Sequence, residues 1–262
     1  MSSAIAAPHP SLRTFSRPFS RFGLVPIGGR STAARLSDGG VWVLASTPLD
    51  EGTKKELEGL GEVKYIVAAD AVHHLYVSDF AKAYPTAKVI GVEGLEAKRP
   101  EVKWDGIYGR DPPDTKYGFE ADVSARYFST FANKDVAFCH HESKTLITAD
   151  LLFNLPPTEQ YKSTPAGRPT SWIPFAGTFA KHMTPASGLH QRFLWMAGAA
   201  AGEGSAAERR KTFAQDAAAV AGWDFERIIM CHGDLIEGKD KARKAWIDVC
   251  ARYLDADGKP KV

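Results

Sequence analysis

Four side chains with metal-binding atoms follow segments of apolar strand character in this sequence: His73, His74, Asp150 and His232. The three segments lie at residues 64–68, 145–149 and 227–231, and their apolar residues favour short buried strands. Polar residues at the carboxyl ends of strands are where α/β folds place their sites. Neutral imidazole and carboxylate together suit zinc, and also iron or manganese. The spacing therefore predicts a metal site.

The segments that must position these side chains alternate between strand and helix. Residues 63–92 have the pattern of a strand, a helix and a second strand, which predicts a parallel unit of an α/β fold. Further strands are predicted at 125–128 and 136–140, and helices at 207–221 and 239–254. The polar residues after the first strand of the unit therefore lie at the edge where α/β folds bind ligands.

The domain organisation predicted from composition is simple. Residues 1–20, with three prolines and several serines, predict a loose N-terminal arm, and residues 21–262 predict one domain. Within that domain, residues 155–206 differ in composition and read as an insertion rich in proline and aromatic residues. Thr53, with Glu56 three residues later, predicts a capping box at the start of a helix.

Two motifs resemble the metallo-β-lactamase superfamily. Thr148-Ala149-Asp150-Leu151 resembles the family's T-G-D-L, whose aspartate bridges the metals at the end of a strand, and Cys231-His232-Gly233-Asp234 resembles its G-H-G-D. The segment 65–74 lies where the family carries its H-x-H-x-D-H motif. The resemblance spans roughly residues 22–255 and implies an α/β fold, the four-layer αββα sandwich of that superfamily.

The departures from the family pattern fall on one of its two metal sites. Aligning His74 with the last histidine of H-x-H-x-D-H puts Ala69 and Ala71 where the first two histidines belong. The family's G-H-T motif falls near residues 130–132, Thr-Phe-Ala, which contain no histidine. A methyl or phenyl group cannot bind a metal, so the resemblance implies that this first site is lost. It implies that the second site is retained, with one divalent ion, zinc first, held by His73, His74, Asp150 and His232.

Two alternatives stay open at this point. The register of the first motif can slip by one residue, which makes His73 the family histidine and Asp70 the replacement for the second one. The lost ligands can also mean that no metal binds, and that the fold is kept for binding a ligand.

The superfamily mostly hydrolyses lactams, lactones, thioesters and phosphoesters. The resemblance therefore implies a hydrolase of a small ester-, lactone- or thioester-like substrate that uses one metal-activated water. Asp70 or His73 would handle the proton, and Asp234 would orient a ligand imidazole. The alternatives are a mononuclear non-haem metal enzyme with redox or isomerisation chemistry at the same site, and a non-catalytic ligand-binding protein.

The insertion at 155–206 predicts the substrate-binding wall. Its aromatic side chains can cover the site and build an apolar surface. The residues that we assign to substrate binding on this basis are Tyr161, Trp172 and His182.

Composition excludes several classes of partner. Across 262 residues, 33 basic residues against 31 acidic residues give a net charge of +2, which does not indicate nucleic acid or an anionic membrane. No apolar run approaches the ~20 residues of a membrane helix. Three cysteines without a framework spacing fit a reducing compartment, so we expect a cytoplasmic protein with a small-molecule substrate. No pattern indicates an oligomeric state.

Overall fold

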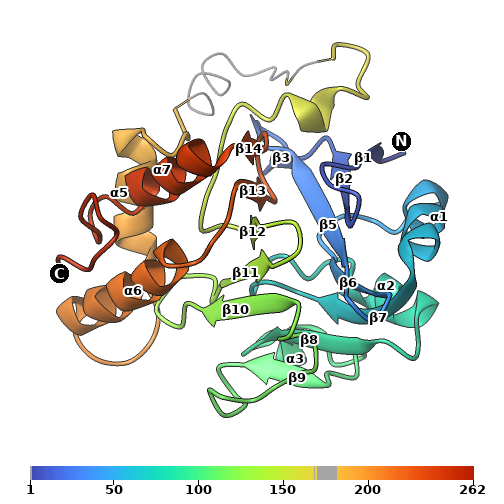
Figure 1. Cartoon of the computed structure of the whole chain (residues 1–262), viewed down its shortest axis with the longest axis horizontal. Helices are drawn as coiled ribbons and strands as arrows, with labels where there is room; N and C mark the ends of the chain where they lie inside the picture. Colours follow the sequence, from blue (N-terminus) through green and yellow to red (C-terminus); the bar gives the residue numbers. More distant parts are fainter. Residues whose placement is uncertain (1, 168, 170–181) are drawn as a thin grey trace.

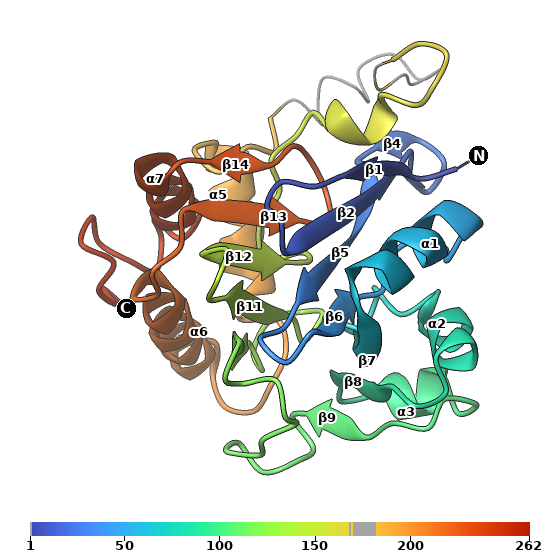
Figure 2. The ribbon, with the colours of Figure 1, turned by 45° about the vertical axis from the view of Figure 1, so that its right-hand side comes forward.

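Two β-sheets lie face to face with helices on their outer sides, in a computed structural model that describes residues 2–167, 169 and 182–262 (Figure 1). Figure 2 shows the order of the layers: the helices within residues 188–249, then the smaller sheet of five strands, then the larger sheet of seven strands, then the helices within residues 51–98. This arrangement is the predicted αββα sandwich of the α/β class.

The larger sheet has seven strands in the order β1-β2-β5-β6-β7-β8-β9. Its strands are β1 (Ala4–Ala6), β2 (Leu12–Arg17), β5 (Gly29–Arg35), β6 (Gly40–Leu44), β7 (Glu62–Val67), β8 (Lys88–Val92) and β9 (Gly106–Tyr108). From β6 to β9 the strands are parallel. The crossovers are made by helices α1 (Glu51–Leu60), α2 (Val77–Ala83) and α3 (Leu95–Lys98). A small hairpin, β3 (Ser20–Arg21) with β4 (Val25–Pro26), stands apart from this sheet.

The smaller sheet has five strands in chain order. They are β10 (Val123–Tyr127), β11 (Val136–His140), β12 (Thr145–Thr148), β13 (Arg227–Met230) and β14 (Ile236–Glu237). Strands β12 and β13 are parallel neighbours although about eighty residues separate them, with Thr148 paired to Met230. Their carboxyl ends therefore lie side by side, which brings the residues after each strand together. Helices α5 (Gly188–Ala197), α6 (Ala206–Ala221) and α7 (Lys239–Val249) lie on the outer side of this sheet.

The core between the sheets is aromatic. Trp42 from β6 contacts Phe138 from β11 edge-to-face at 5.0 Å between ring centroids, and Phe119 packs against both. All three are fully buried. Since burying one such side chain is worth roughly 1.5–3 kcal/mol, these contacts fix the two sheets against each other.

The N-terminal residues are not the loose arm that their composition suggests. Strands β1 and β2 belong to the large sheet, and Leu12 and Phe15 of β2 are fully buried. The prolines at 8 and 10 lie in the connection between the two strands, so they do not interrupt the pairing. The apolar side chains of this segment decide its structure, because pairing in the sheet buries them, and the prolines do not prevent that pairing.

Helix α1 begins earlier than predicted, and its cap is Asp50 rather than Thr53. Asp50 Oδ1 accepts the backbone N–H of Thr53 at 2.8 Å, and Asp50 Oδ2 accepts the backbone N–H of Ser3 at 2.7 Å. Burial opposes ionisation, but these hydrogen bonds from Thr53 and Ser3 lower the pKa of Asp50 to about 2. One carboxylate thus caps the helix and ties down the N-terminus.

The predicted insertion contains a 3-10 turn, Glu159–Tyr161, and helix α5. Trp172 lies outside the described residues. Among the residues that the structure describes, no helix has the length and apolar character needed to cross a membrane.

Candidate metal centre

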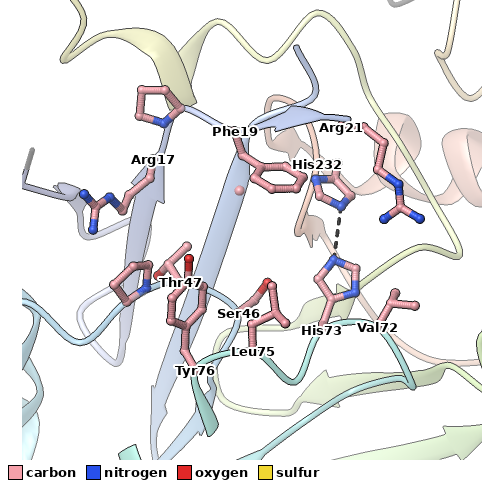
Figure 3. Close-up of a pocket in the computed structure, with 13 residues that line it drawn as sticks. Arg17, Phe19, Arg21, Ser46, Thr47, Val72, His73, Leu75, Tyr76 and His232 are labelled. Carbon is pink, nitrogen blue, oxygen red and sulfur yellow. Dashed lines mark hydrogen bonds between the residues drawn. The ribbon is translucent and has the colours of Figure 1, made fainter. Parts of the chain in front are cut away.

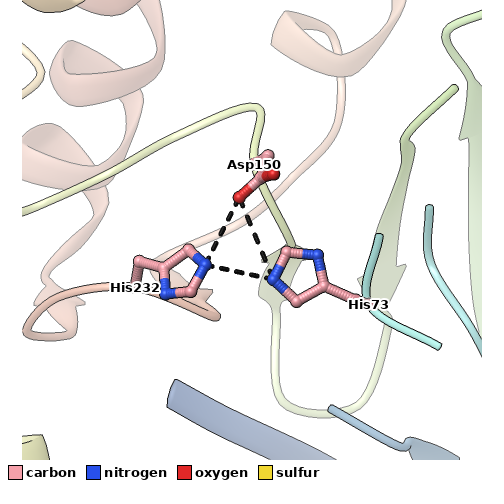
Figure 4. Close-up of side chains that lie close together, drawn as sticks. All are labelled: His73, Asp150 and His232. Atoms are coloured by element: carbon pink, nitrogen blue, oxygen red, sulfur yellow. Dashed lines mark hydrogen bonds and ion pairs between the residues drawn. The ribbon is translucent and has the colours of Figure 1, made fainter. Parts of the chain in front are cut away.

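His73, Asp150 and His232 face one another at the carboxyl ends of β7, β12 and β13 (Figure 4). Their ligand atoms all lie within 4.8 Å of one another. The two Nε2 atoms are 3.1 Å apart, and Asp150 Oδ1 lies 3.4 Å from Nε2 of His232 and 3.9 Å from Nε2 of His73. Three strand ends from two sheets therefore converge on one point.

The spacing of these three atoms fits a single divalent ion. A triangle with these sides has its centre about 2.0 Å from each corner, and zinc bonds to imidazole nitrogen or carboxylate oxygen are about 2.0–2.2 Å long. Two imidazoles and one carboxylate also suit iron and manganese, so the donor set does not select the element.

His73 is oriented by Asp70. Asp70 Oδ1 accepts the backbone N–H groups of Val72 and His73, which forms the turn after β7, and Asp70 Oδ2 lies 2.8 Å from Nδ1 of His73. Because Nδ1–H donates a hydrogen bond to this carboxylate, Nε2 is the ring atom that remains available to a metal ion. Asp70 is fully buried and acts on the centre through His73.

His232 is oriented by backbone and by a buried arginine. Its Nδ1 donates to the carbonyl of Gly28 at 2.6 Å, which leaves Nε2 facing the centre. Arg30, fully buried on β5, donates to the carbonyls of Met230 and Gly233 at 2.9 and 2.7 Å, on both sides of His232. Gln160 closes the same turn with bonds to the Cys231 carbonyl and the Gly233 N–H.

Asp150 is held by two neighbours that sequence analysis did not single out. Asn133 Nδ2 donates to Asp150 Oδ2 at 2.5 Å, so Oδ1 is the oxygen that faces the two histidines. Asp135 Oδ2 accepts the backbone N–H groups of Asp150 and Leu151, and this fixes the turn after β12. The only local signal for Asp135 is a lone acidic residue directly before the apolar strand β11.

The charges around the centre favour a cation. Burial opposes the protonation of His73, but the carboxylates of Asp70 and Asp150 outweigh it and raise the pKa of His73 to about 10. Burial alone would raise the pKa of Asp150, but His73 and His232 lower it to about 2. Burial and the nearby Asp70 and Asp150 raise the pKa of Asp135 well above its usual value.

The structure brings together three of the four predicted ligands and not the fourth. Nδ1 of His74 accepts a hydrogen bond from Arg99 Nε at 3.0 Å, and His74 is not part of the group within 4.8 Å. Successive residues in a turn point in different directions, so His73 and His74 cannot both face the centre here. Of the pair, His73 belongs to the group of candidate ligands and His74 does not.

Two predicted supporting roles also differ. Asp70 is predicted to handle a proton, but the carboxylate oxygens of Asp70 face His73 and the turn rather than a cavity. Asp234 is predicted to orient a ligand imidazole. Asp234 instead accepts hydrogen bonds from Glu159 N and Thr158 Oγ1, because the turn at Gly233, with φ of 107°, carries it away from the ring of His232.

Two of the three predicted substrate-binding residues are described, and neither lines a cavity at the centre. Tyr161 is buried, and its hydroxyl donates to the carbonyl of Phe19 at 2.8 Å, so it supports the chain behind the site. His182 is exposed, and its carbonyl accepts a hydrogen bond from Ser187. Trp172 lies outside the described residues.

Two cavities meet at the centre. The smaller, of about 280 Å³, is lined by His73 and His232 together with Arg17, Phe19 and Arg21 (Figure 3). The larger, of about 720 Å³, is lined by His232, Asp150 and a mostly apolar wall. Phe131, which stands where the resemblance places a family histidine, is part of that wall. Arg21 and His232 line both cavities.

Aromatic rings hold the imidazole of His232 between the cavities. The Phe153 ring, which lines the larger cavity, stacks on it with ring centroids 5.4 Å apart and an interplanar angle of 5°. The Phe19 ring, which lines the smaller cavity, stacks on it with ring centroids 6.2 Å apart. Phe19, Arg21 and Arg30 are not among the predicted site residues. Phe19 lies in the segment predicted to be a loose arm, and Arg21 and Arg30 follow it in the chain. Only the pairing of β2 with β5 places that segment over the site.

Comparison with known proteins agrees on the fold. No protein-family model matches this sequence, and no curated protein matches it either. Solved structures do match over nearly the whole chain. A metallo-β-lactamase from Pontibacter korlensis is 10% identical, with 94% of this chain and 98% of that chain covered and a TM-score of 0.52.

Two further structures agree. A metallo-β-lactamase from Hirschia baltica is 7% identical, with both chains fully covered and a TM-score of 0.56. The metallo-β-lactamase FIM-1 from Pseudomonas aeruginosa, in its mono-zinc form, is 10% identical, with 96% of this chain and 94% of that chain covered and a TM-score of 0.57. The chain therefore has the metallo-β-lactamase fold, as its motifs predicted.

Asp70→Asn is expected to weaken zinc binding by about ten- to a hundredfold with little loss of stability. The amide oxygen can still accept the two backbone N–H groups of the turn. The amide NH₂ would instead donate to Nδ1 of His73, which moves the ring proton to Nε2, the metal-facing atom. Zinc affinity by competition with a chelator, beside the urea unfolding curve, checks this. Unchanged affinity would contradict the orienting role of Asp70.

Zinc affinity is also expected to rise with pH by about tenfold per unit between pH 6 and 9. The pKa of His73 is raised to about 10, so its ring carries a proton below that pH, and zinc must displace the proton to bind Nε2. As pH rises towards 10, the competition falls. Calorimetric titration at pH 7.5 in two buffers with different heats of ionisation should show about one proton released per zinc. No proton release would show that His73 is neutral beforehand.

Proposed function

We propose that this protein is a metal-dependent hydrolase of an ester-, lactone- or thioester-like substrate, with one divalent ion held by His73, Asp150 and His232. The observation that carries the proposal is the convergence of these three ligand atoms, each oriented by a second partner, beside two cavities. Structural zinc sites use four protein ligands, whereas catalytic ones keep three and leave a position for water or substrate. The described part of the chain offers three ligands at this centre.

A divalent ion at such a centre lowers the pKa of a water molecule and polarises a carbonyl oxygen. The chain's own residues supply the geometry. Asp70 keeps Nε2 of His73 directed at the centre, and the Gly28 carbonyl does the same for His232. Arg21 lies close enough to favour the ionised form of Asp150, and it would place a positive charge beside the position where charge develops on the substrate.

Zinc is the first choice of ion, because one of the fold's structural neighbours is described as a mono-zinc form. Iron and manganese remain compatible with the donor set. All three cysteines are free and buried, which supports a reducing, cytoplasmic compartment. The cavity at the centre supports a small molecule as the substrate.

The test is a hydrolysis panel on zinc-loaded protein. The panel contains a p-nitrophenyl ester, a γ-lactone, an acyl thioester and a β-lactam, each assayed beside the Asp150→Ala variant. We expect turnover of at least one ester, lactone or thioester that is lost on chelation and in the variant. Bound zinc without any turnover would overturn the hydrolase proposal. Bound iron with oxygen-dependent activity would favour redox chemistry, and a folded protein that takes up no metal would favour a binding protein.

A further inference from the structure

The larger cavity at the metal centre has a mostly apolar wall. It holds about 720 Å³, and the polar side chains that line it are Arg21, Asn133, Asp150, Arg192 and His232. The other lining residues that the structure describes are apolar. They come from the β3–β4 hairpin and the residue after it, from the connection between β10 and β11, from the segment after β12, and from helix α5 and the segment before it. Asp150 and His232 lie at its inner end, so an occupant of the cavity reaches the proposed metal ligands.

The exposed apolar side chains of the molecule gather at the two cavities. Of the eight large apolar side chains exposed among the described residues, four line the larger cavity, namely Phe22, Leu189, Phe193 and Met196. Two more, Phe19 and Leu75, line the smaller one. Large apolar side chains that cluster at one opening indicate a surface that binds an apolar partner.

Phe22 gives a second indication. Its side chain is 82% exposed and its backbone has φ of 54°, a conformation that a bulky residue rarely adopts. Neither the exposure nor the backbone favours phenylalanine at a hairpin tip, where glycine or asparagine would be less strained. Its side chain lines the larger cavity, so an apolar occupant of that cavity would contact it.

The smaller cavity is mixed in character and carries positive charge. Arg17 and Arg21 line it together with Ser46, Thr47 and Tyr76, and none of the described residues that line it is acidic (Figure 3). Its volume of about 280 Å³ suits a small polar group. Arg21 lines both cavities, so the positive charge stands at the junction where the metal ligands also lie.

We infer that the substrate is an anionic amphiphile, with an acyl chain in the larger cavity and a negatively charged group beside Arg21 in the smaller one. This inference rests on the proposed function and names its substrate class. The bond to be cleaved would then join the acyl group to the anionic part, as in a long-chain acyl ester or thioester. The chain length, and not only the ester group, would determine affinity.

The first test uses sodium hexanoate, octanoate and decanoate as probes, below their micellar concentrations, in calorimetric titrations with and without a chelator. We expect affinity to rise about three- to fourfold for each added methylene in both conditions, because each buried methylene leaves water. Affinity that does not change with chain length would overturn the inference.

The second test compares matched variants. Phe22→Gln/Met196→Gln, at two exposed positions on the rim, is expected to weaken decanoate binding at least tenfold, whereas Ile5→Gln, at an exposed position lining neither cavity, is not. Arg21→Gln is expected to weaken decanoate but not decan-1-ol. Equal losses in the rim and Ile5 variants, or equal effects of Arg21→Gln on both probes, would contradict the assignment.

These outcomes separate the inference from the proposed function. Chain-length dependence in a protein that takes up no metal would support the amphiphile site and overturn the hydrolase. Ester hydrolysis without chain-length dependence would support the hydrolase and overturn the amphiphile site. Co-sedimentation with phosphatidylglycerol vesicles distinguishes a dissolved amphiphile from a lipid surface. Binding to vesicles without affinity for monomeric decanoate would overturn the inference.

Discussion

His232→Ala and Asp150→Ala are each expected to reduce bound zinc from about one equivalent to a trace. Removing a residue that only orients a metal ligand typically costs ten- to a hundredfold in affinity, so losing one of three ligands should cost at least on the order of a hundredfold. Both side chains place their ligand atom within 4.8 Å of the others. Elemental analysis after dialysis against zinc, followed by chelator competition, measures the effect.

His74→Ala is the matched control for this experiment. His74 is adjacent in sequence to His73 and has the same side chain, but its Nδ1 accepts a hydrogen bond from Arg99 Nε. We expect its zinc content to equal that of the unmodified protein, whereas His73→Ala should lose zinc as His232→Ala does. Loss of zinc in His74→Ala with retention in His73→Ala would show that the two histidines exchange places when the metal binds.

Arg30→Met is expected to destabilise the fold by about 3 kcal/mol and also to weaken zinc binding. The Arg30 side chain is fully buried, forms an ion pair with Glu159 at 2.8 Å and donates to the two carbonyls that flank His232. Removing one partner of a buried pair typically costs about 3–5 kcal/mol. Glu159 is 32% exposed and can regain water, which places the expected loss at the lower end. Urea unfolding measures the stability.

Arg13→Met serves as the control for the loss of an arginine. Arg13 pairs with Glu56 at 3.1 Å, but both side chains are partly exposed, so the expected loss is at most about 1 kcal/mol. Its zinc affinity should not change, because Arg13 does not touch the turn that carries His232. If the two variants lose equal stability, or if Arg30→Met keeps full zinc affinity, the role given to Arg30 in holding that turn is wrong.

The sequence by itself predicted the α/β class and the three strands that lead to the candidate ligands, β7, β12 and β13. The apolar runs at 88–92 and 136–140 match β8 and β11, and the run at 227–231 matches β13 with one extra residue. Such runs are informative because a strand buried on both faces is apolar throughout. The fold followed from the resemblance of two motifs, around Asp150 and His232, and the structure confirms it.

Only the tertiary structure determined which side chains meet. From the sequence, His73 and His74 are equally good candidate ligands, because the two residues are adjacent and have the same side chain. The turn held by Asp70 is what directs His73, and not His74, at the centre. Arg30, on β5, lies far along the chain from the carbonyl of Met230 that it binds. Asp135 is nearer in sequence, directly before β11, but it acts on Asp150 only through backbone groups of the turn after β12. Their roles depend on long-range pairing and on bonds to backbone groups, for which no local sequence pattern exists.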